Sequence, residues 1–100
     1  MSSKIYKMWK ARPTAAWFEL SEEEQNGMLA KNGAYMEKHG VKTIVLCDPF
    51  WSTEQWAFFG VEEYADMEAV QAHAAFLNEH NWLRYIESEI MFGTEMVDAT

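Results

Sequence analysis

The order of strand-like and helix-like segments is the feature that most limits how this chain can fold. Two stretches place apolar residues at the three- and four-residue steps of a helix, and four have the short apolar pattern of strands. In chain order we expect a strand at 5–11, a helix from 21 to 38 or 39, strands at 41–48 and 56–64, a helix from 66, and a strand at 89–97. The predicted order is therefore β-α-β-β-α-β.

Both predicted helices have clear start signals. Ser21 and Glu24 form a capping box, in which each side chain bonds the backbone amide of the other residue, and Gly40 is a typical helix stop. Asp66 can cap the second helix. Residues 15–20 stay unassigned, and residues 82–86 are either the last turn of the second helix or a turn beyond it.

This order is that of the split βαβ or ferredoxin-like plan, an α+β fold in which two helices cover one face of a four-stranded antiparallel sheet. The free face of a monomer should be polar, yet every predicted strand has bulky apolar residues on both faces. The unbroken run at residues 44–47 in particular predicts burial on both faces. We therefore expect a homodimer, joined sheet to sheet. The alternative is that the chain's own termini and residues 48–55 cover this face.

Composition narrows the classes of partner. A chain of 100 residues predicts a single domain over residues 1–100, and a net charge of −8 argues against nucleic acid and anionic membrane surfaces. We find neither a signal sequence nor a membrane-spanning segment. The single cysteine, Cys47, fits a cytoplasmic location and is expected to be a small hydrophobe rather than a nucleophile.

Two histidines on one face of the second helix are the strongest chemical signal. His73 and His80 are seven residues apart, which places them about 10 Å apart along the helix axis. His73 is the first choice for a general acid or base and His80 the second, with Tyr64 and Tyr35 as supporting donors. The structural alternatives are a neutral His73 bonded to a carbonyl and a His80 at the surface near the helix end.

The residues between Tyr64 and His73 carry a resemblance to a known family. An aromatic residue ends the third strand, a capped Glu-Ala-Val run follows it, and a histidine comes nine residues after the aromatic. With the element order, this pattern resembles the dimeric α/β-barrel superfamily, in particular its antibiotic-biosynthesis-monooxygenase-like branch, in which His80 would fill the place of a second histidine. That superfamily includes cofactor-free monooxygenases, haem-degrading enzymes, muconolactone isomerases, polyketide cyclases, and aldoxime or nitrile lyases, so the fold alone does not choose a reaction.

The resemblance also implies where a ligand would bind. In that architecture the cavity lies between the helices and the sheet of each subunit, and an aromatic, mostly apolar cavity suits a flat ligand. The residues expected to line it are Trp9, Asn32, Tyr35, Met36, His39, Trp56, Phe58, His73, Leu77 and His80.

The haem-degrading subgroup is matched only in part. It has an asparagine on the first strand, a tryptophan at the end of the third strand and a histidine on the second helix. Here the first strand offers Tyr6, Met8 and Trp9, and Tyr64 stands where the tryptophan would be. Haem binding or degradation is therefore a lesser alternative, and we assign no iron ligand.

The sequence thus predicts a small-molecule enzyme acting on an aromatic or polyketide-like substrate. The reaction would be cofactor-free oxygenation or a proton transfer of the isomerase or cyclase type. No metal or nucleotide cofactor is expected, because the sequence has no Gly-rich phosphate loop, no Cys-x-x-Cys and no His-Glu-x-x-His. The alternative is a non-catalytic homodimer that binds a small ligand or accompanies a pathway enzyme.

Overall fold

The computed structural model describes residues 4–96, in which strands and helices alternate as the sequence predicts. The elements are β1 (Ile5–Pro13), α1 (Ala15–Phe18), α2 (Glu22–His39), β2 (Lys42–Cys47), β3 (Phe58–Tyr64), α3 (Met67–Glu79), α4 (Trp82–Tyr85) and β4 (Ile86–Gly93).

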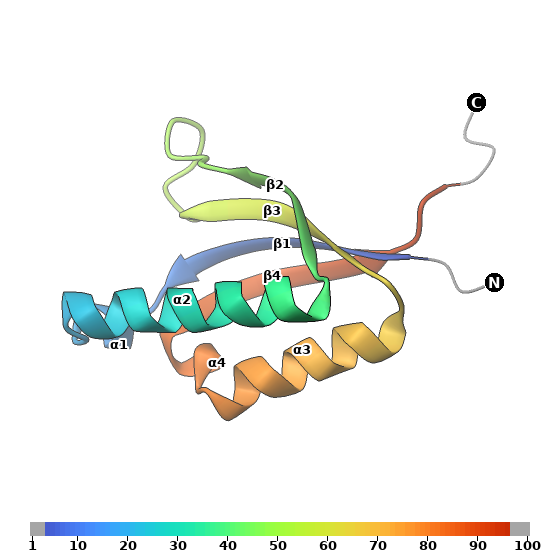
Figure 1. The fold of residues 1–100 in the computed structure, drawn as a ribbon. Coiled ribbons are helices and arrows are strands. Elements are labelled where there is room, and N and C mark those ends of the chain that lie inside the picture. Colours follow the sequence, from blue (N-terminus) through green and yellow to red (C-terminus); the bar gives the residue numbers. More distant parts are fainter. Residues whose placement is uncertain (1–3, 97–100) are drawn as a thin grey trace.

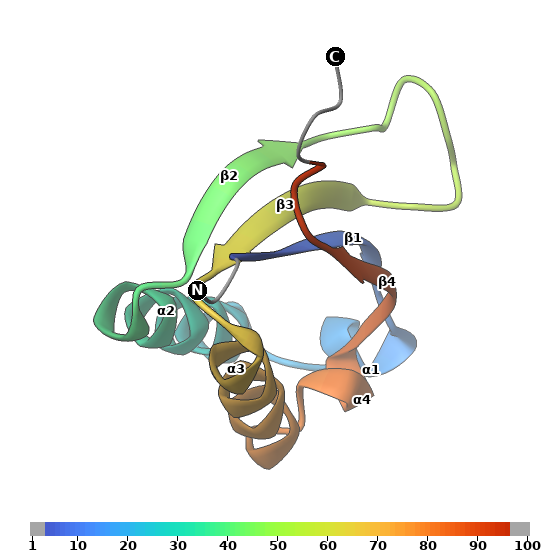
Figure 2. The ribbon, with the colours of Figure 1, turned by 90° about the vertical axis from the view of Figure 1, so that its right-hand side faces the viewer.

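The strands form one antiparallel sheet in the order β2-β3-β1-β4. All the helices lie on one side of this sheet, with α2 and α3 as the two long ones (Figure 1). Seen along the strands, the sheet curves over the helices, and the β2–β3 loop projects away from them (Figure 2). The predicted α+β, ferredoxin-like plan is confirmed.

The predicted helix ends are confirmed by their capping bonds. The Ser21 side chain accepts from the Glu24 amide, and the Glu24 carboxylate accepts from the Ser21 amide. Gly40 ends α2 with φ 72°, a left-handed conformation that favours glycine. The Asp66 carboxylate accepts from the Ala69 amide at 2.8 Å and fixes the start of α3.

Several predicted strand ends were wrong by a few residues. β1 runs on to Pro13, which is tolerated because its pairing with β3 has already ended at Ala11 and its only partner is β4. β3 begins at Phe58 rather than at residue 56. β4 begins at Ile86, directly after the separate helix α4, and ends at Gly93, and the predicted strand end at Val97 lies outside the described residues.

The core is small and lies at one end of the molecule, where α2 leads into β2 and β3 leads into α3. It consists of Met36, Val41, Tyr64 and Val70, with Ile5 and Ala69 packed against it. Tyr64 is its most buried member, with 1 % of its surface exposed. The other end of the space between the helices and the sheet is not filled by this core.

The sheet face away from the helices carries a continuous apolar row. Val45, Val61, Met8 and Met91 are successive cross-strand partners over β2, β3, β1 and β4. Within the single chain, residues 44–46 are exposed, so the predicted burial of both faces of β2 is wrong for the monomer. The reason is that β2 is an edge strand, with a register shift between Thr43 and Val45. The 48–55 loop does not cover this row either, because Val45, Met8 and Met91 remain 43 %, 49 % and 59 % exposed.

Gly60 permits the close approach of β2 and of the Trp9 ring to β3. A substitution at this position tests the close approach. A Cβ at Gly60 would lie 2.6 Å from the Val45 carbonyl oxygen and 3.1 Å from Trp9 Cζ2. We expect Gly60→Ala to lower the free energy of unfolding by about 1–3 kcal/mol, measured by urea titration. Gly33→Ala is the control, because nothing lies within 4 Å of its Cβ. Since alanine favours a helix, that variant should be more stable by about 0.5–1 kcal/mol. Equal effects of the two substitutions would contradict the close approach.

Candidate functional site

A cavity of about 360 Å³ lies between the helices and the sheet, next to the core. Its walls are largely apolar, and they include the exposed side chains of Leu29, Leu46 and Phe58. Thr43 and Ser88 also line it, and its four other polar members cluster nearer the core. These four are Lys7 of β1, Asn32 of α2, Glu62 of β3 and His73 of α3. The cavity therefore has an apolar mouth and a polar floor.

His73 is fixed through both ring nitrogens by side chains. Nε2 lies 2.8 Å from Asn32 Oδ1, and Nδ1 lies 2.7 Å from the Tyr64 hydroxyl. Because an amide oxygen can only accept, Nε2 donates to Asn32, and in the neutral ring Nδ1 accepts from Tyr64. Only 2 % of His73 is exposed, and burial, with a smaller effect of the Lys7 charge, lowers its pKa to about 4. His73 is thus a neutral imidazole near pH 7, as in the structural alternative. Within residues 4–96, however, its ring nitrogens bond to side chains and not to a backbone carbonyl.

Tyr64 lies behind the cavity floor and joins it to the core. Its hydroxyl is 3.2 Å from Glu62 Oε1 as well as 2.7 Å from His73 Nδ1. Burial, followed by the negative charge of Glu62 and the hydrogen bond to it, raises the pKa of Tyr64 above its ordinary value. Tyr64 therefore remains a neutral hydroxyl that links a carboxylate to an imidazole.

Lys7 and Glu62 form a largely buried ion pair that the sequence interpretation missed. They are direct cross-strand partners in β1 and β3, and Lys7 Nζ lies 3.6 Å from Glu62 Oε1. Their side chains are only 12 % and 9 % exposed, whereas lysine and glutamate are seldom buried unless paired. The available signal was strand alternation, because Lys7 shares a face with Ile5 and Trp9.

Six of the residues predicted to line a cavity do line this one. They come from both long helices and two strands, and they are Trp9, Asn32, Met36, Phe58, His73 and Leu77. Trp9 also has a buried indole nitrogen, Nε1, for which residues 4–96 provide no hydrogen-bond partner. A ligand oxygen near this ring could accept from it.

Four other residues predicted to line a cavity do not line this one. They are Tyr35, His39, His80 and Trp56. Tyr35 sits at the seam of α2 and α3, with ring centroids 4.2 Å from Phe76 and 5.3 Å from His73. The exposed ring of His39 lies against Tyr35, tilted by 31°. His80 is the exposed C-cap of α3 and lies against Phe76.

Trp56 packs on the opposite face of the sheet. Its ring lies 5.1 Å from Lys10 Nζ and 4.9 Å from the Arg12 guanidinium carbon. The predicted alternation failed here because β3 begins only at Phe58, so Trp56 lies outside the strand and does not share the face of Phe58.

The site offers little to a metal. Both nitrogens of His73 are occupied by hydrogen bonds, so this histidine has no free nitrogen for haem iron. Within residues 4–96 there is no group of three or more His, Cys, Asp or Glu side chains placed to hold a metal ion. The donor set does not fit the haem alternative.

None of the helices in this part of the chain has the length and apolar character of a membrane-spanning helix.

Comparisons with known proteins add no relative. No protein-family model, no curated protein and no solved structure matches this chain.

The lowered pKa of His73 predicts a pH dependence of stability. As the pH falls from 6.5 towards 4, the unfolded chain takes up a proton at His73 while the folded chain does not. Above pH 6.5 the contribution of neutral His73 to the free energy of unfolding is therefore fully present. Between pH 6.5 and 4 the free energy of unfolding falls by up to about 3 kcal/mol. We expect His73→Gln to remove this part of the pH slope in urea unfolding. His80→Gln, at an exposed position, should keep the wild-type slope, and a wild-type slope in His73→Gln would contradict the prediction.

Proposed function

We propose that this chain is a small-molecule enzyme that acts by proton transfer in the cavity between the helices and the sheet. The observation that carries the proposal is the connected set of polar groups at the floor of an otherwise apolar cavity. Lys7, Glu62, Tyr64, His73 and Asn32 are joined by contacts of 2.7–3.6 Å. Buried polar groups beyond the needs of folding are costly, and they concentrate where chemistry needs them.

The walls indicate the substrate class. Aromatic and aliphatic side chains such as Trp9, Phe58 and Trp82 suit a flat aromatic or polyketide-like molecule, with its polar end at the floor. Removal of a proton next to a carbonyl would begin an isomerisation or a cyclisation. The same step would begin a cofactor-free oxygenation, in which the substrate anion reacts directly with dioxygen. Reactions of these kinds occur among members of the dimeric α/β-barrel superfamily, which the chain resembles in its element order and in the Tyr64–His73 pattern.

The proposal is tested with a panel of quinols and polyketide mimics. Oxygen consumption and deuterium exchange next to carbonyls are measured for the purified protein, and at least one compound should be turned over. His73→Ala should lower that turnover at least about 10-fold, because it removes the group that orients Tyr64. The control, His80→Ala, should leave it unchanged. Unchanged turnover in His73→Ala would remove His73 from the mechanism, whereas binding of the panel without turnover would favour the non-catalytic alternative.

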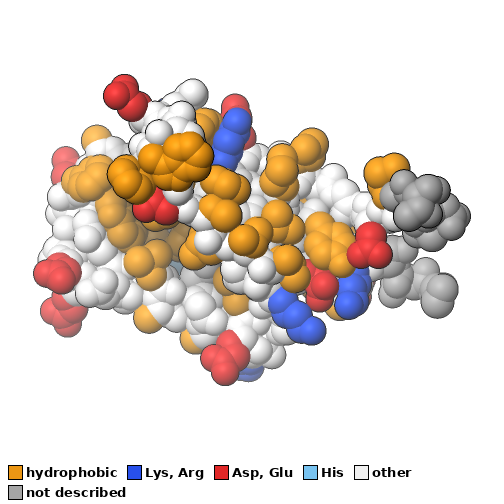
Figure 3. Space-filling model, turned by 90° about the horizontal axis from the view of Figure 1, so that it is seen from above, with side chains coloured by type: hydrophobic (Ala, Val, Ile, Leu, Met, Phe, Trp, Pro, Cys, Tyr) orange, Lys and Arg blue, Asp and Glu red, His pale blue; other side chains and the backbone are white. Residues whose placement is uncertain are grey.

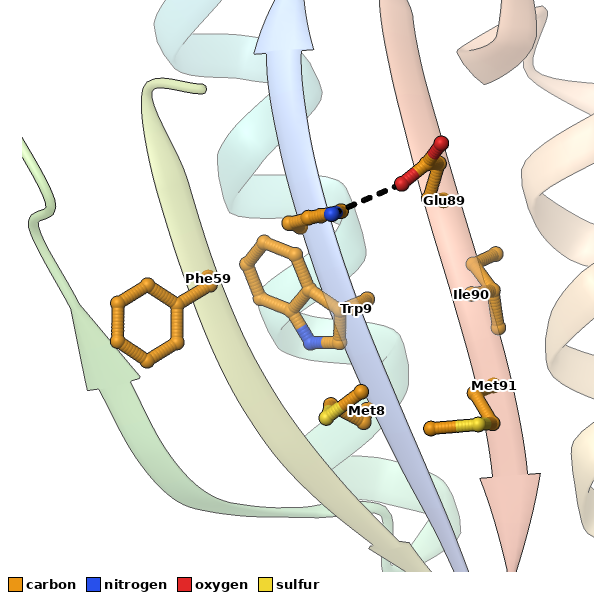
Figure 4. A pocket seen from close by; sticks show the side chains of 7 residues that line it. Met8, Trp9, Phe59, Glu89, Ile90 and Met91 are labelled. Atoms are coloured by element: carbon orange, nitrogen blue, oxygen red, sulfur yellow. Dashed lines mark ion pairs between the residues drawn. The ribbon is translucent and has the colours of Figure 1, made fainter. Parts of the chain in front are cut away.

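The exposed sheet face supports a second copy of the chain as the partner. Figure 3 shows hydrophobic side chains spread over this face. Met8, Phe59 and Met91, labelled in the close-up in Figure 4, line a pocket there, whose volume is about 530 Å³. An apolar surface crossing four strands is more than a monomer ordinarily exposes, and a two-fold dimer would pack the row of one sheet against that of the other.

Charge on this face is compatible with self-association. The chain carries a net charge of −8, which should disfavour contact between two copies. Beside the apolar row, however, acidic groups are paired. Lys10 Nζ lies 2.9 Å from Glu89 Oε2, and Lys4 Nζ lies 3.6 Å from Glu63 Oε1. The ion pairs therefore neutralise part of the charge on this face, and its apolar contacts need not overcome the full repulsion.

The dimer is tested by a charge in the middle of the apolar row. Light scattering at micromolar concentration should give a dimer for the wild type and a monomer for Met8→Glu, because the interface would bury an unpaired carboxylate. Met67→Glu is the matched control, since Met67 is 48 % exposed and Met8 is 49 % exposed, but Met67 lies in the first turn of α3. A wild type that stays monomeric would contradict the dimer.

A further inference from the structure

The polar floor of the cavity is one proton short of a complete chain of hydrogen bonds. His73 Nε2 donates to Asn32, so Nδ1 takes the single hydrogen of the Tyr64 hydroxyl. The same hydroxyl is placed to donate to Glu62 Oε1, which lies 3.2 Å from the Tyr64 oxygen, but it has only one hydrogen for these two acceptors. When Glu62 is ionised, one of the two contacts therefore lacks a donor. A proton on Glu62 would supply the missing donor, and the chain would run unbroken from Glu62 through Tyr64 and His73 to Asn32.

When Glu62 takes up that proton, the positive charge of Lys7 loses its partner. Its ammonium lies 3.6 Å from Glu62 Oε1, and both side chains line the cavity. Once Glu62 is neutral, Lys7 is a buried cation without its carboxylate partner, which is unfavourable unless another anion replaces it. An oxyanion formed on a bound substrate would be such a replacement.

From this geometry we infer that Glu62 is the proton-accepting catalytic residue of the cavity and that Lys7 stabilises the resulting oxyanion. This inference rests on the proposed function. In it, His73 and Tyr64 are positioning residues. The substrate class is a carbon acid, an apolar molecule with a C–H bond next to a carbonyl or an equivalent electron acceptor. A histidine base is less suited to this cavity, because both nitrogens of His73 are already bonded.

The step balances without an oxidant or a co-reactant. The C–H bond breaks, its proton goes to a Glu62 carboxylate oxygen, and its electron pair forms the C=C bond of an enolate whose charge lies on oxygen beside Lys7. In a substrate with a further C=C bond conjugated to the enolate, return of the proton from Glu62 to the far carbon of that bond breaks the new O–H bond, shifts the double bond and yields an isomer. The charge pair of the resting site, Lys7 with Glu62, is replaced during the reaction by Lys7 with the substrate oxygen, so the net charge of the cavity stays constant.

The experiment uses 5-nitrobenzisoxazole, a flat, apolar carbon acid. A base removes its C–H proton, the electron pair forms a nitrile, the N–O bond breaks, and the coloured 2-cyano-4-nitrophenolate is released. We expect saturable release by the wild type. Glu62→Gln should lower the rate at least about 100-fold, as expected on removal of a general base. Lys7→Met should lower it about 10-fold or more, because the developing phenolate loses its cation. Glu63→Gln is the matched control, since Glu63 is the next residue of β3 and lies on the other face, and it should react as the wild type does.

Binding of the probe, followed by tryptophan fluorescence, separates the possible failures. If Glu62→Gln keeps the wild-type rate, the assignment of Glu62 as the base is overturned. The proposal of a proton-transfer enzyme is then kept, with another residue as the base. If the wild type binds the probe without accelerating its reaction, the assignment is overturned and ligand binding survives. If the wild type neither binds nor reacts, the assignment and the proposed function fall together.

A second variant guards against misfolding of Glu62→Gln. Glu62→Asp keeps the carboxylate but draws it back by one methylene, so it should bind the probe as well as the wild type and react at least about 10-fold more slowly. Unchanged reaction in a folded Glu62→Asp would also count against Glu62 as the base, because a base must lie within hydrogen-bond reach of the proton it removes.

Discussion

The burial of polar side chains beside a small core is the constraint on which the rest of this molecule depends. A buried glutamate, a buried histidine and a largely buried lysine would each be costly alone, and each is retained because a neighbour satisfies it. The partners come from four different elements, β1, β3, α2 and α3, so the network exists only when the helices dock on the sheet in one register. The Lys7–Glu62 pairing fixes that register between β1 and β3, and the Asp66 cap fixes where α3 begins and hence where His73 lies.

The same geometry explains why the cavity stays open at one end. The short helix α4 follows α3 through Asn81, whose φ of 60° is a left-handed conformation that asparagine tolerates better than most residues. The Thr14 hydroxyl donates to the Arg84 carbonyl at 2.7 Å, and the Thr14 amide donates to the Tyr85 carbonyl at 2.9 Å. These bonds hold α4 beside the end of β1 and place Trp82 at the cavity wall instead of letting α3 continue. Apolar side chains therefore frame a mouth there, while Tyr64 and the core close the opposite end.

Local patterns predicted the fold well, and non-local pairing limited the prediction of the site. The caps at Ser21 and Asp66 and the stop at Gly40 are read from neighbouring residues, and the structure confirms them. Asn32 and His73 were found because a polar residue on an apolar helix face is visible in the periodicity. Lys7 and Glu62 were missed because each looks like an ordinary surface charge until β1 and β3 are aligned, and their partnership spans 55 residues of chain. Trp56 was misplaced for the related reason that alternation within a strand says nothing about where the strand begins.

The two proposed surfaces use alternate residues of the same strands. Lys7 and Glu62 face the helices, whereas the adjacent Met8 and Val61 face away from them and lie in the apolar row. Because side chains alternate across the pleat, the sheet keeps an ionic floor on one side and an apolar surface on the other without either set of side chains touching the other. The backbone between them is shared, however, and a dimer packed on the outer face would hold β1 and β3 in the register that the ion pair needs. Association would then favour the arrangement of the cavity floor without contributing a side chain to it.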